Sequence, residues 1–168
     1  MDVFEAVRTV LAVRQFQDKP IPEEVVNEIA QAAHLTASSI NGQPWHFIVV
    51  QDKNMLQQLG KLATTGPYIA QAPLAVVVAM EQSPYAVSDV SRAIQDMILT
   101  AWSHGVGSNW VGFNNLKQVN PVLGIPDTIE IMAIIPFGYP VANIGKGNKK
   151  RKPFGEVVYR EKWGQPFA

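Results

Sequence analysis

The run LAVVVAM, residues 74–80, constrains the fold more than any other stretch of this sequence. Its seven residues are all apolar, whereas a strand with one face in solvent alternates apolar and polar residues. A continuously apolar strand is typical of a position that is buried on both faces of a sheet. The run therefore predicts the central strand of a sheet that helices cover.

Segments on both sides of this run show helical or strand-like patterns. Apolar residues recur at helical spacing over residues 3–11, after Pro22, after Asp52 and over residues 87–101, and a further short helix is expected to end at Gly124. Strand-like runs occur at HFIVV, SNWVGF and IEIMAIIPF. This order is compatible with α+β or α/β layering. The length of 168 residues and the hydrophobic content of 47% suit one domain.

Charge and composition exclude several classes of partner. Lysine plus arginine and aspartate plus glutamate both number 14, so the formal net charge is zero and no global field attracts nucleic acid or a membrane surface. The absence of cysteine excludes disulfides, thiolate metal sites and a cysteine nucleophile. The acidic start MDVFEAVRTV and the lack of a long apolar run lead us to expect a cytoplasmic protein without nucleic-acid or membrane partners.

A polar loop precedes one predicted strand in ASSINGQPWHFIVV, residues 37–50. Pro44 disfavours a helical conformation at the residue before it and has no backbone N–H. Short donors and acceptors crowd this stretch, namely Ser38, Ser39, Asn41 and Gln43. The pattern predicts a turn or a binding loop beside a buried strand.

A basic run and an aromatic tail follow the predicted globular pattern. Five of the 14 basic residues fall in KGNKKRK, residues 146–152, which is either a solvated loop or an anion site. It lacks the interleaved aromatic residues of a nucleic-acid surface. Tyr159, Trp163 and Phe167 are spaced four apart and need a surface to cover, either on the same subunit or on a second copy.

No catalytic signature stands out from the remaining residues. His34, His46 and His104 are scattered and have no partner at metal-ligand spacing. The chain has no G-x-S-x-G, Walker or G-x-G-x-x-G sequence. Asp89 and Asp96 lie seven apart in a predicted helix, where solvation or capping is the favoured interpretation.

Five motifs nevertheless follow one another in the order VRQFQDKPIP, ASSINGQPWHFIVV, AIQDMILTAWSHGVGSNWVGF, PFGYP and KKRKPFGEVVY. In this order they resemble the nitroreductase family of FMN-dependent oxidoreductases along almost the whole chain. The resemblance implies an α+β fold with a central, mostly antiparallel sheet flanked by helices, and FMN in a cleft at a homodimer interface. It also implies one domain over residues 1–168, whose C-terminal arm, about residues 157–168, is exchanged between the two copies.

The resemblance also implies roles for particular residues. Arg14 matches the basic residue on the phosphate and ribityl side of FMN, and Lys149 with Arg151 matches the C-terminal phosphate pair. The polar loop lines the flavin ring and ribityl chain, and the segment from Trp110 to Gly112 matches a strand end whose backbone amides approach flavin N5. The implied cofactor-binding residues are Arg14, Ser38, Ser39, Asn41, Gln43, Val111, Gly112, Lys149 and Arg151.

The chain departs from the family at its N-terminal Arg-x-Ser, where it has Val10 and Ala12. One phosphate-binding arginine and one hydroxyl are therefore missing. A hydrogen bond to a charged group contributes about 1.5–3 kcal/mol, so losing one would weaken FMN binding about ten- to a hundredfold. Arg8 and Lys150 are the candidates to compensate.

The implied reaction is hydride transfer from NAD(P)H, a transient donor, through flavin N5 to a nitroaromatic, quinone or similar electron-poor acceptor in a ping-pong cycle. The flavin carries the chemistry, so no catalytic side chain is expected. Three alternatives stay open at this point. They are a flavin-binding protein with little turnover, a relative that performs ene reduction, dehalogenation or flavin destruction, and a nucleic-acid binder that uses the basic run.

Overall fold

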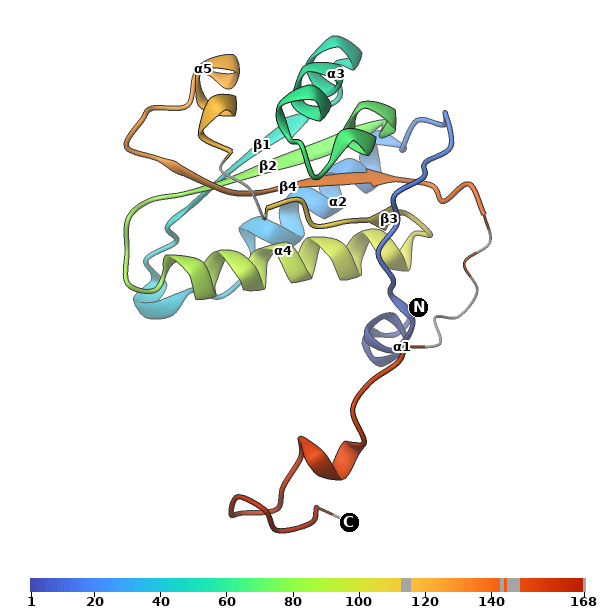
Figure 1. Ribbon diagram of the computed structural model, residues 1–168, viewed down its shortest axis with the longest axis vertical. Coiled ribbons are helices and arrows are strands. Elements are labelled where there is room, and N and C mark those ends of the chain that lie inside the picture. Colours follow the sequence, from blue (N-terminus) through green and yellow to red (C-terminus); the bar gives the residue numbers. More distant parts are fainter. Residues whose placement is uncertain (113–115, 143, 145–148, 168) are drawn as a thin grey trace.

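The computed structural model describes residues 1–112, 116–142, 144 and 149–167. A body of helices and strands carries a C-terminal segment that projects from it (Figure 1). The helices are α1 (Val3–Thr9), α2 (Glu23–His34), α3 (Lys53–Leu62), α4 (Ala86–Ser103) and α5 (Asn120–Leu123). The strands are β1 (Trp45–Val50), β2 (Leu74–Met80), β3 (Gly107–Ser108) and β4 (Glu130–Gly138).

The four strands form one sheet in the order β1-β2-β4-β3, and every neighbouring pair is antiparallel. An antiparallel sheet with helices on its faces is an α+β arrangement, so the α+β prediction is confirmed and the α/β alternative is wrong. The predicted strand SNWVGF is much shorter than expected. Only Ser108 belongs to β3, and Val111 adds an isolated bridge to Ile134.

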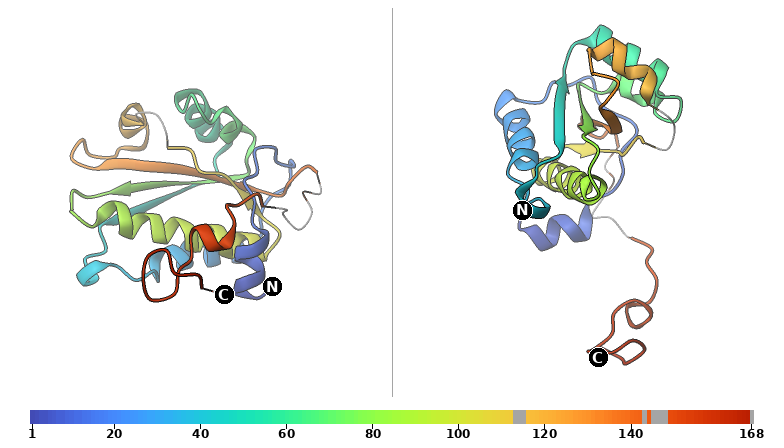
Figure 2. Two further views of the ribbon diagram at one scale, coloured as in Figure 1. Left: turned by 60° about the horizontal axis from the view of Figure 1, so that its bottom comes forward. Right: turned by 90° about the vertical axis from the view of Figure 1, so that its left-hand side faces the viewer.

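Strand β2 is buried along its whole length, as its apolar sequence predicts. Val76 and Val78 enter a core with α2 and α4, whereas Val77 and Ala79 enter a second core with α3 on the opposite face. Figure 2 shows the helices on both sides of the sheet. A fully buried valine side chain stabilises a fold by about 1.5–3 kcal/mol. The sheet and its two helical layers therefore form the scaffold to which the polar segments attach.

Helix α1 lies outside these two cores, near the C-terminal end of α4 (Figure 1). It packs against Trp102 of α4 in a small third core. The helix ends at Thr9, two residues before the end that periodicity predicts. Its outer face exposes Val3 and Phe4, which are 76% and 75% exposed. Large apolar side chains at this exposure mark a surface suited to contact with another chain.

The C-terminal segment extends away from the body instead of folding back onto it (Figures 1 and 2). Its aromatic rings pair among themselves, with centroids 4.9 Å apart for Tyr159 and Trp163 and 5.8 Å apart for Phe154 and Phe167. Trp163 is still 88% exposed. The structure therefore does not show the arm covering its own subunit.

Candidate functional site

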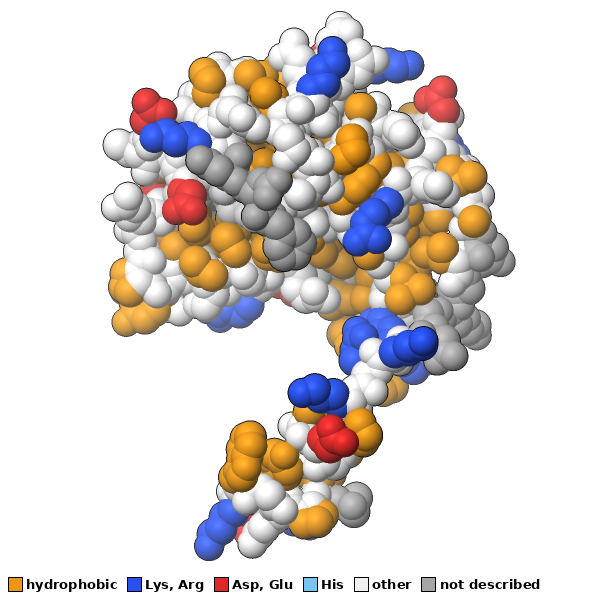
Figure 3. Space-filling model, viewed as in Figure 1, with side chains coloured by type: hydrophobic (Ala, Val, Ile, Leu, Met, Phe, Trp, Pro, Cys, Tyr) orange, Lys and Arg blue, Asp and Glu red, His pale blue; other side chains and the backbone are white. Residues whose placement is uncertain are grey.

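A cavity of about 410 Å³ lies where the N-terminal segment, helix α4 and the start of the C-terminal segment meet. We call it the basic pocket, because Lys149 and Arg151 line it. Figure 3 shows lysine and arginine side chains gathered at this junction of body and arm. The other walls include Val10, Ala12, Ile98 and Trp110.

The pocket forms because the N-terminal segment runs alongside strand β3. Ala12 makes an isolated parallel bridge with Ser108, and the Val13 N–H donates to the Ser108 carbonyl over 2.8 Å. Gly107 permits this approach, since a Cβ at that position would lie 2.3 Å from Val13 Cγ2. The bridge puts Val10 and Ala12 into the pocket wall, where neither supplies a polar side-chain group.

Lys149 and Arg151 place two positive charges in this pocket. The Lys149 Nζ donates to the Val7 carbonyl over 2.5 Å. Burial lowers the pKa of Lys149, and the charge of Arg151 lowers it further. Neither residue belongs to any of the ion pairs found in the described part of the chain. A bound phosphate would reduce the repulsion between them, so the pocket suits a phosphorylated ligand.

Arg8 and Lys150, the candidates to replace the missing arginine, do not line the pocket. Arg8 donates to both carboxylate oxygens of Glu5, over 2.9 and 2.8 Å. The Lys150 side chain is exposed, and its carbonyl accepts from Arg151 over 2.9 Å. Lys146, which also belongs to the basic run, lies outside the described residues.

Arg14 lies on the N-terminal segment just beyond the bridge to β3. Val13 is buried, whereas Ala12 and Arg14 on either side of it are exposed. Arg14 is not part of the pocket wall, although Ala12, two residues before it, lines the pocket. The structure thus places Arg14 beside the pocket.

The segment expected near flavin N5 is divided between two cavities. Trp110 lines the basic pocket, whereas Gly112 lines a separate cavity of about 510 Å³ with Met132. Val111 is buried, and its N–H donates to the Ile134 carbonyl over 3.0 Å. The Val111 amide is therefore already used within the sheet, and it is not a free donor for a ligand.

Residues 38–43, which we call the serine loop, lie beside the N-terminal end of α4, whereas α1 and β3 lie near its other end (Figure 1). The loop contains left-handed backbone at Ile40, Asn41 and Gln43, with φ of 50°, 56° and 49°. Such conformations cost about 1–3 kcal/mol each and persist only where the surroundings impose them. The structure groups the polar loop residues together, but it does not bring them into the basic pocket.

Asp89, in the first turn of α4, holds the serine loop. Its carboxylate accepts from the Ser39 N–H over 3.0 and 3.1 Å and from Ser39 Oγ over 2.9 Å. Arg92 pairs with the same carboxylate and donates to Ser39 Oγ over 3.3 Å. Burial raises the pKa of Asp89, but the Ser39 hydrogen bonds and the Arg92 charge outweigh burial, so the pKa lies below its ordinary value.

Sequence reasoning missed this role of Asp89. The pattern assigned it to helix solvation or capping, but its partner lies 50 positions earlier in the chain. A contact at that separation leaves no local signal. The one clue was the position itself, because Asp89 falls among the apolar residues of the predicted helix.

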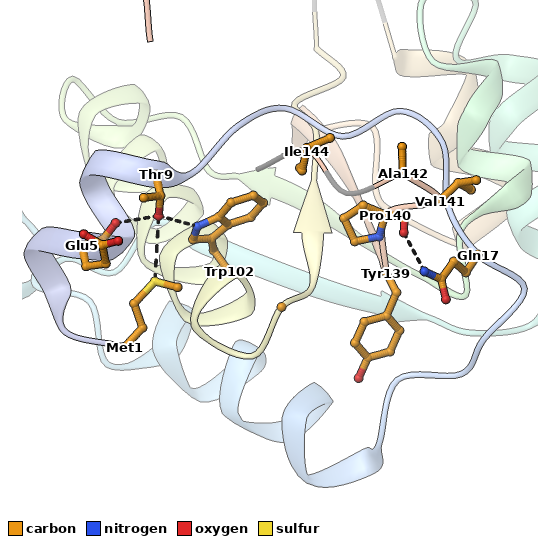
Figure 4. Close-up of a pocket in the computed structure, with 11 residues that line it drawn as sticks. Met1, Glu5, Thr9, Gln17, Trp102, Tyr139, Pro140, Val141, Ala142 and Ile144 are labelled. Carbon is orange, nitrogen blue, oxygen red and sulfur yellow. Dashed lines mark hydrogen bonds between the residues drawn. The ribbon is translucent and has the colours of Figure 1, made fainter. Parts of the chain in front are cut away.

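A further cavity, of about 460 Å³, lies against a different face of α1 (Figure 4). The Trp102 Nε1 donates to Thr9 Oγ1 over 2.9 Å, and Thr9 Oγ1 donates to the Glu5 carbonyl over 2.6 Å. Gln17 Nε2 donates to the Pro140 carbonyl. No lysine or arginine is among the described residues that line it. Its polar groups are engaged with one another, and it lacks the charge of the basic pocket.

Two of the three histidines, His46 and His104, form contacts at the surface. His46 lies 3.1 Å from Glu81, and His104 lies 2.7 Å from Glu28. Within the described ranges, no three histidine or acidic side chains come together in a group that could hold a metal ion. No helix in those ranges combines the length and the apolar character needed to cross a bilayer.

Sequence comparison connects this geometry with known proteins. The family described as "Putative TM nitroreductase" matches residues 2–166. A protein of Methanothermobacter thermautotrophicus named "Putative NADH dehydrogenase/NAD(P)H nitroreductase" is 34% identical, over 97% of this chain and 88% of that protein. A protein of the same name from Archaeoglobus fulgidus is 32% identical, over 96% and 99%. An iodotyrosine deiodinase of Thermotoga neapolitana is 24% identical, over 88% and 91%.

Structural comparison gives the same result. A structure described as an FMN-dependent nitroreductase from Clostridium difficile superposes with a TM-score of 0.85 at 25% identity, over 95% of this chain and 99% of that one. A structure from Parabacteroides distasonis, described as a "Putative NADH dehydrogenase/NAD(P)H nitroreductase", superposes with a TM-score of 0.85 at 26% identity, over 96% and 98%.

Proposed function

The chain belongs to the nitroreductase family of FMN-dependent NAD(P)H oxidoreductases, and we propose that it reduces nitroaromatics, quinones or similar flat, electron-poor acceptors in a ping-pong cycle. When bound, FMN would supply the redox chemistry that links NAD(P)H to the acceptor. The protein then contributes binding, orientation and electrostatics. No side-chain acid or base is part of the proposal.

The basic pocket is the observation that carries this proposal. Lys149 and Arg151 would hold the phosphate of FMN, since neither is engaged in an ion pair within the described ranges. Trp110 and Ile98 would border the apolar part of the cofactor. A phosphate-binding pair beside an aromatic wall fits a phosphorylated aromatic group, and Arg14 is close enough along the chain to assist.

The serine loop and the strand end would complete the site. Ser38, Asn41 and Gln43 would offer short polar groups to the flavin ring and ribityl chain, with Ser39 beneath them. The Gly112 N–H would act as the backbone donor near N5, where Val111 cannot. Charge that develops on the ring would be stabilised by such a donor.

We propose that the site is assembled in a homodimer in which a single domain, residues 1–168, contributes an arm to its partner. The exposed apolar face of α1 and the exposed Trp163 support this proposal, because each needs a covering surface. The serine loop of one copy would then face the basic pocket of the other, since within one copy the two lie near opposite ends of α4 (Figure 1).

The visible absorbance spectrum of the purified protein tests the cofactor and the donor together. We expect flavin bands that bleach under anaerobic conditions on adding NADPH or NADH. A protein that neither carries FMN nor binds added FMN would contradict the proposal. Steady-state lines for donor and acceptor that converge would show that the ping-pong order is wrong.

Two alternative functions each rest on a specific observation. Val10 and Ala12 line the basic pocket without a polar side chain, which favours a flavin-binding protein with little turnover. NAD(P)H consumption no faster than with free FMN would support that candidate. The relative named iodotyrosine deiodinase favours reductive dehalogenation instead. A panel of nitroaromatic, quinone, enone and halophenol acceptors distinguishes these activities.

A further inference from the structure

The buried carboxylate of Asp89 holds the serine loop at Ser39. Asp89 is the only buried ionisable side chain among the described residues, with 1% of its surface exposed. A buried carboxylate is costly unless hydrogen bonds and an opposite charge compensate it. Ser39 and Arg92 provide that compensation, so Asp89 and Ser39 depend on each other.

The contact falls immediately before the strained part of the loop. Ser39 precedes Ile40 and Asn41, whose φ angles are positive. At the far end of the loop, the N–H of Gln43, whose φ is also positive, donates to Ser38 Oγ over 3.0 Å. The backbone of the loop is therefore fixed at both ends, and its exposed tip carries the Asn41 and Gln43 side chains outward.

We propose that Asp89 is a positioning residue of the flavin site, which acts through Ser39 to hold the serine loop in the left-handed conformation that presents Asn41 and Gln43 to the cofactor. This inference rests on the proposed function, because it names how that site is preorganised. Without the Asp89 charge, Ser39 is released and the loop relaxes to commoner backbone conformations. FMN must then impose the binding conformation, which lowers its affinity.

The variant Asp89→Asn tests this with nearly unchanged side-chain volume. Asparagine replaces one acceptor oxygen with an NH₂ group, which is a hydrogen-bond donor. The Ser39 N–H and the Arg92 guanidinium are donors too, so they lose an acceptor at this position. We expect the FMN dissociation constant, measured by flavin fluorescence quenching, to rise about tenfold or more. In the protein without FMN, we also expect faster hydrogen exchange at the Gln43 amide, a change that does not depend on the cofactor.

Asp96→Asn is the matched control on the same helix. Asp96 accepts from Thr36 Oγ1 over 2.7 Å, so the chemical change is the same and a hydroxyl group is again a partner, but Asp96 is exposed and its contact lies outside the serine loop. We expect its FMN dissociation constant to stay within about threefold of the wild-type value. An equal loss in both variants would show a general effect of helix α4 and would overturn the proposal.

Ser39→Ala removes the hydrogen bond from Ser39 Oγ to Asp89 and leaves those from the Ser39 N–H, so it weakens the same contact from the loop side. We expect a smaller rise in the FMN dissociation constant than in Asp89→Asn, and this variant keeps the test decisive if Asp89→Asn does not fold. Because both changes act on one interaction, the double variant should lose little more FMN affinity than Asp89→Asn alone. Losses that multiply, or a folded Ser39→Ala protein with unchanged affinity and exchange, would overturn the positioning role. A wild-type protein that does not bind FMN would overturn the proposed function itself, and this inference with it.

Discussion

At the scale of single residues, the phosphate assignment depends on Lys149 and Arg151. We expect Lys149→Ala to weaken FMN binding about ten- to a hundredfold, since it removes a hydrogen bond to a charged group. The affinity of the same variant for riboflavin, which lacks the phosphate, should fall much less. Lys152→Ala is the control, because Lys152 is exposed and does not line the basic pocket. Equal losses for FMN and riboflavin would contradict a phosphate contact.

The charge of Asp89 predicts a pH dependence of stability. Its pKa in the folded protein lies below the ordinary value of 3.8, so its contribution is complete above that value and is lost as the pH falls through the folded pKa. We expect wild type to resist urea better than Asp89→Asn at pH 5–7, and this difference to shrink below about pH 4. Urea midpoints measured between pH 2.5 and 7 check this, and a difference independent of pH would contradict it.

At the scale of elements, the N-terminal segment and strand β3 must approach closely to form the basic pocket. We expect Gly107→Ala to push this segment away, because a Cβ would overlap Val13, and to lower stability by about 1–3 kcal/mol together with FMN affinity. Val13→Ala in the same chain should restore part of both. Gly155→Ala is the control, since nothing lies within 4 Å of a Cβ there. Urea unfolding and FMN titration are the measurements, and an unaffected Gly107→Ala protein would contradict the argument.

At the scale of the whole molecule, the arm needs a partner surface. We expect a chain that ends at residue 153 to sediment as a monomer at micromolar concentration, whereas the full chain sediments as a dimer. The physical reason is that Trp163 and the other arm aromatics have no surface on their own body. A truncated chain that remains a dimer would assign the interface to α1 instead.

The separation of the serine loop from the basic pocket makes a second prediction at this scale. One variant carries Asn41→Ala with Gln43→Ala, and the other carries Lys149→Ala with Arg151→Ala. If each site combines a loop and a pocket from different copies, mixed dimers contain one intact site and recover FMN binding. If both parts come from one copy, mixing restores nothing. Titration of FMN after unfolding and refolding the two variants together distinguishes these outcomes.

Local sequence pattern by itself determined most of the elements and their burial. The unbroken apolar run of β2 predicts burial on two faces, and the Ser-Asn-Gln cluster before Pro44 predicts a polar loop. Both follow from side chains close together in the chain, where periodicity and backbone preference act. Family resemblance added the cofactor and the candidate residues, which no local pattern contains.

Only the tertiary structure decided how these parts meet. The residue pattern left α+β and α/β open, because strand direction depends on pairing between distant segments. The sequence pattern also left open the role of Asp89, whose partner Ser39 lies 50 residues away. It likewise did not show that the Val111 N–H donates to the Ile134 carbonyl. Hydrogen bonds between distant residues exist only once the chain is folded, so they decide which predicted groups stay free to bind a cofactor.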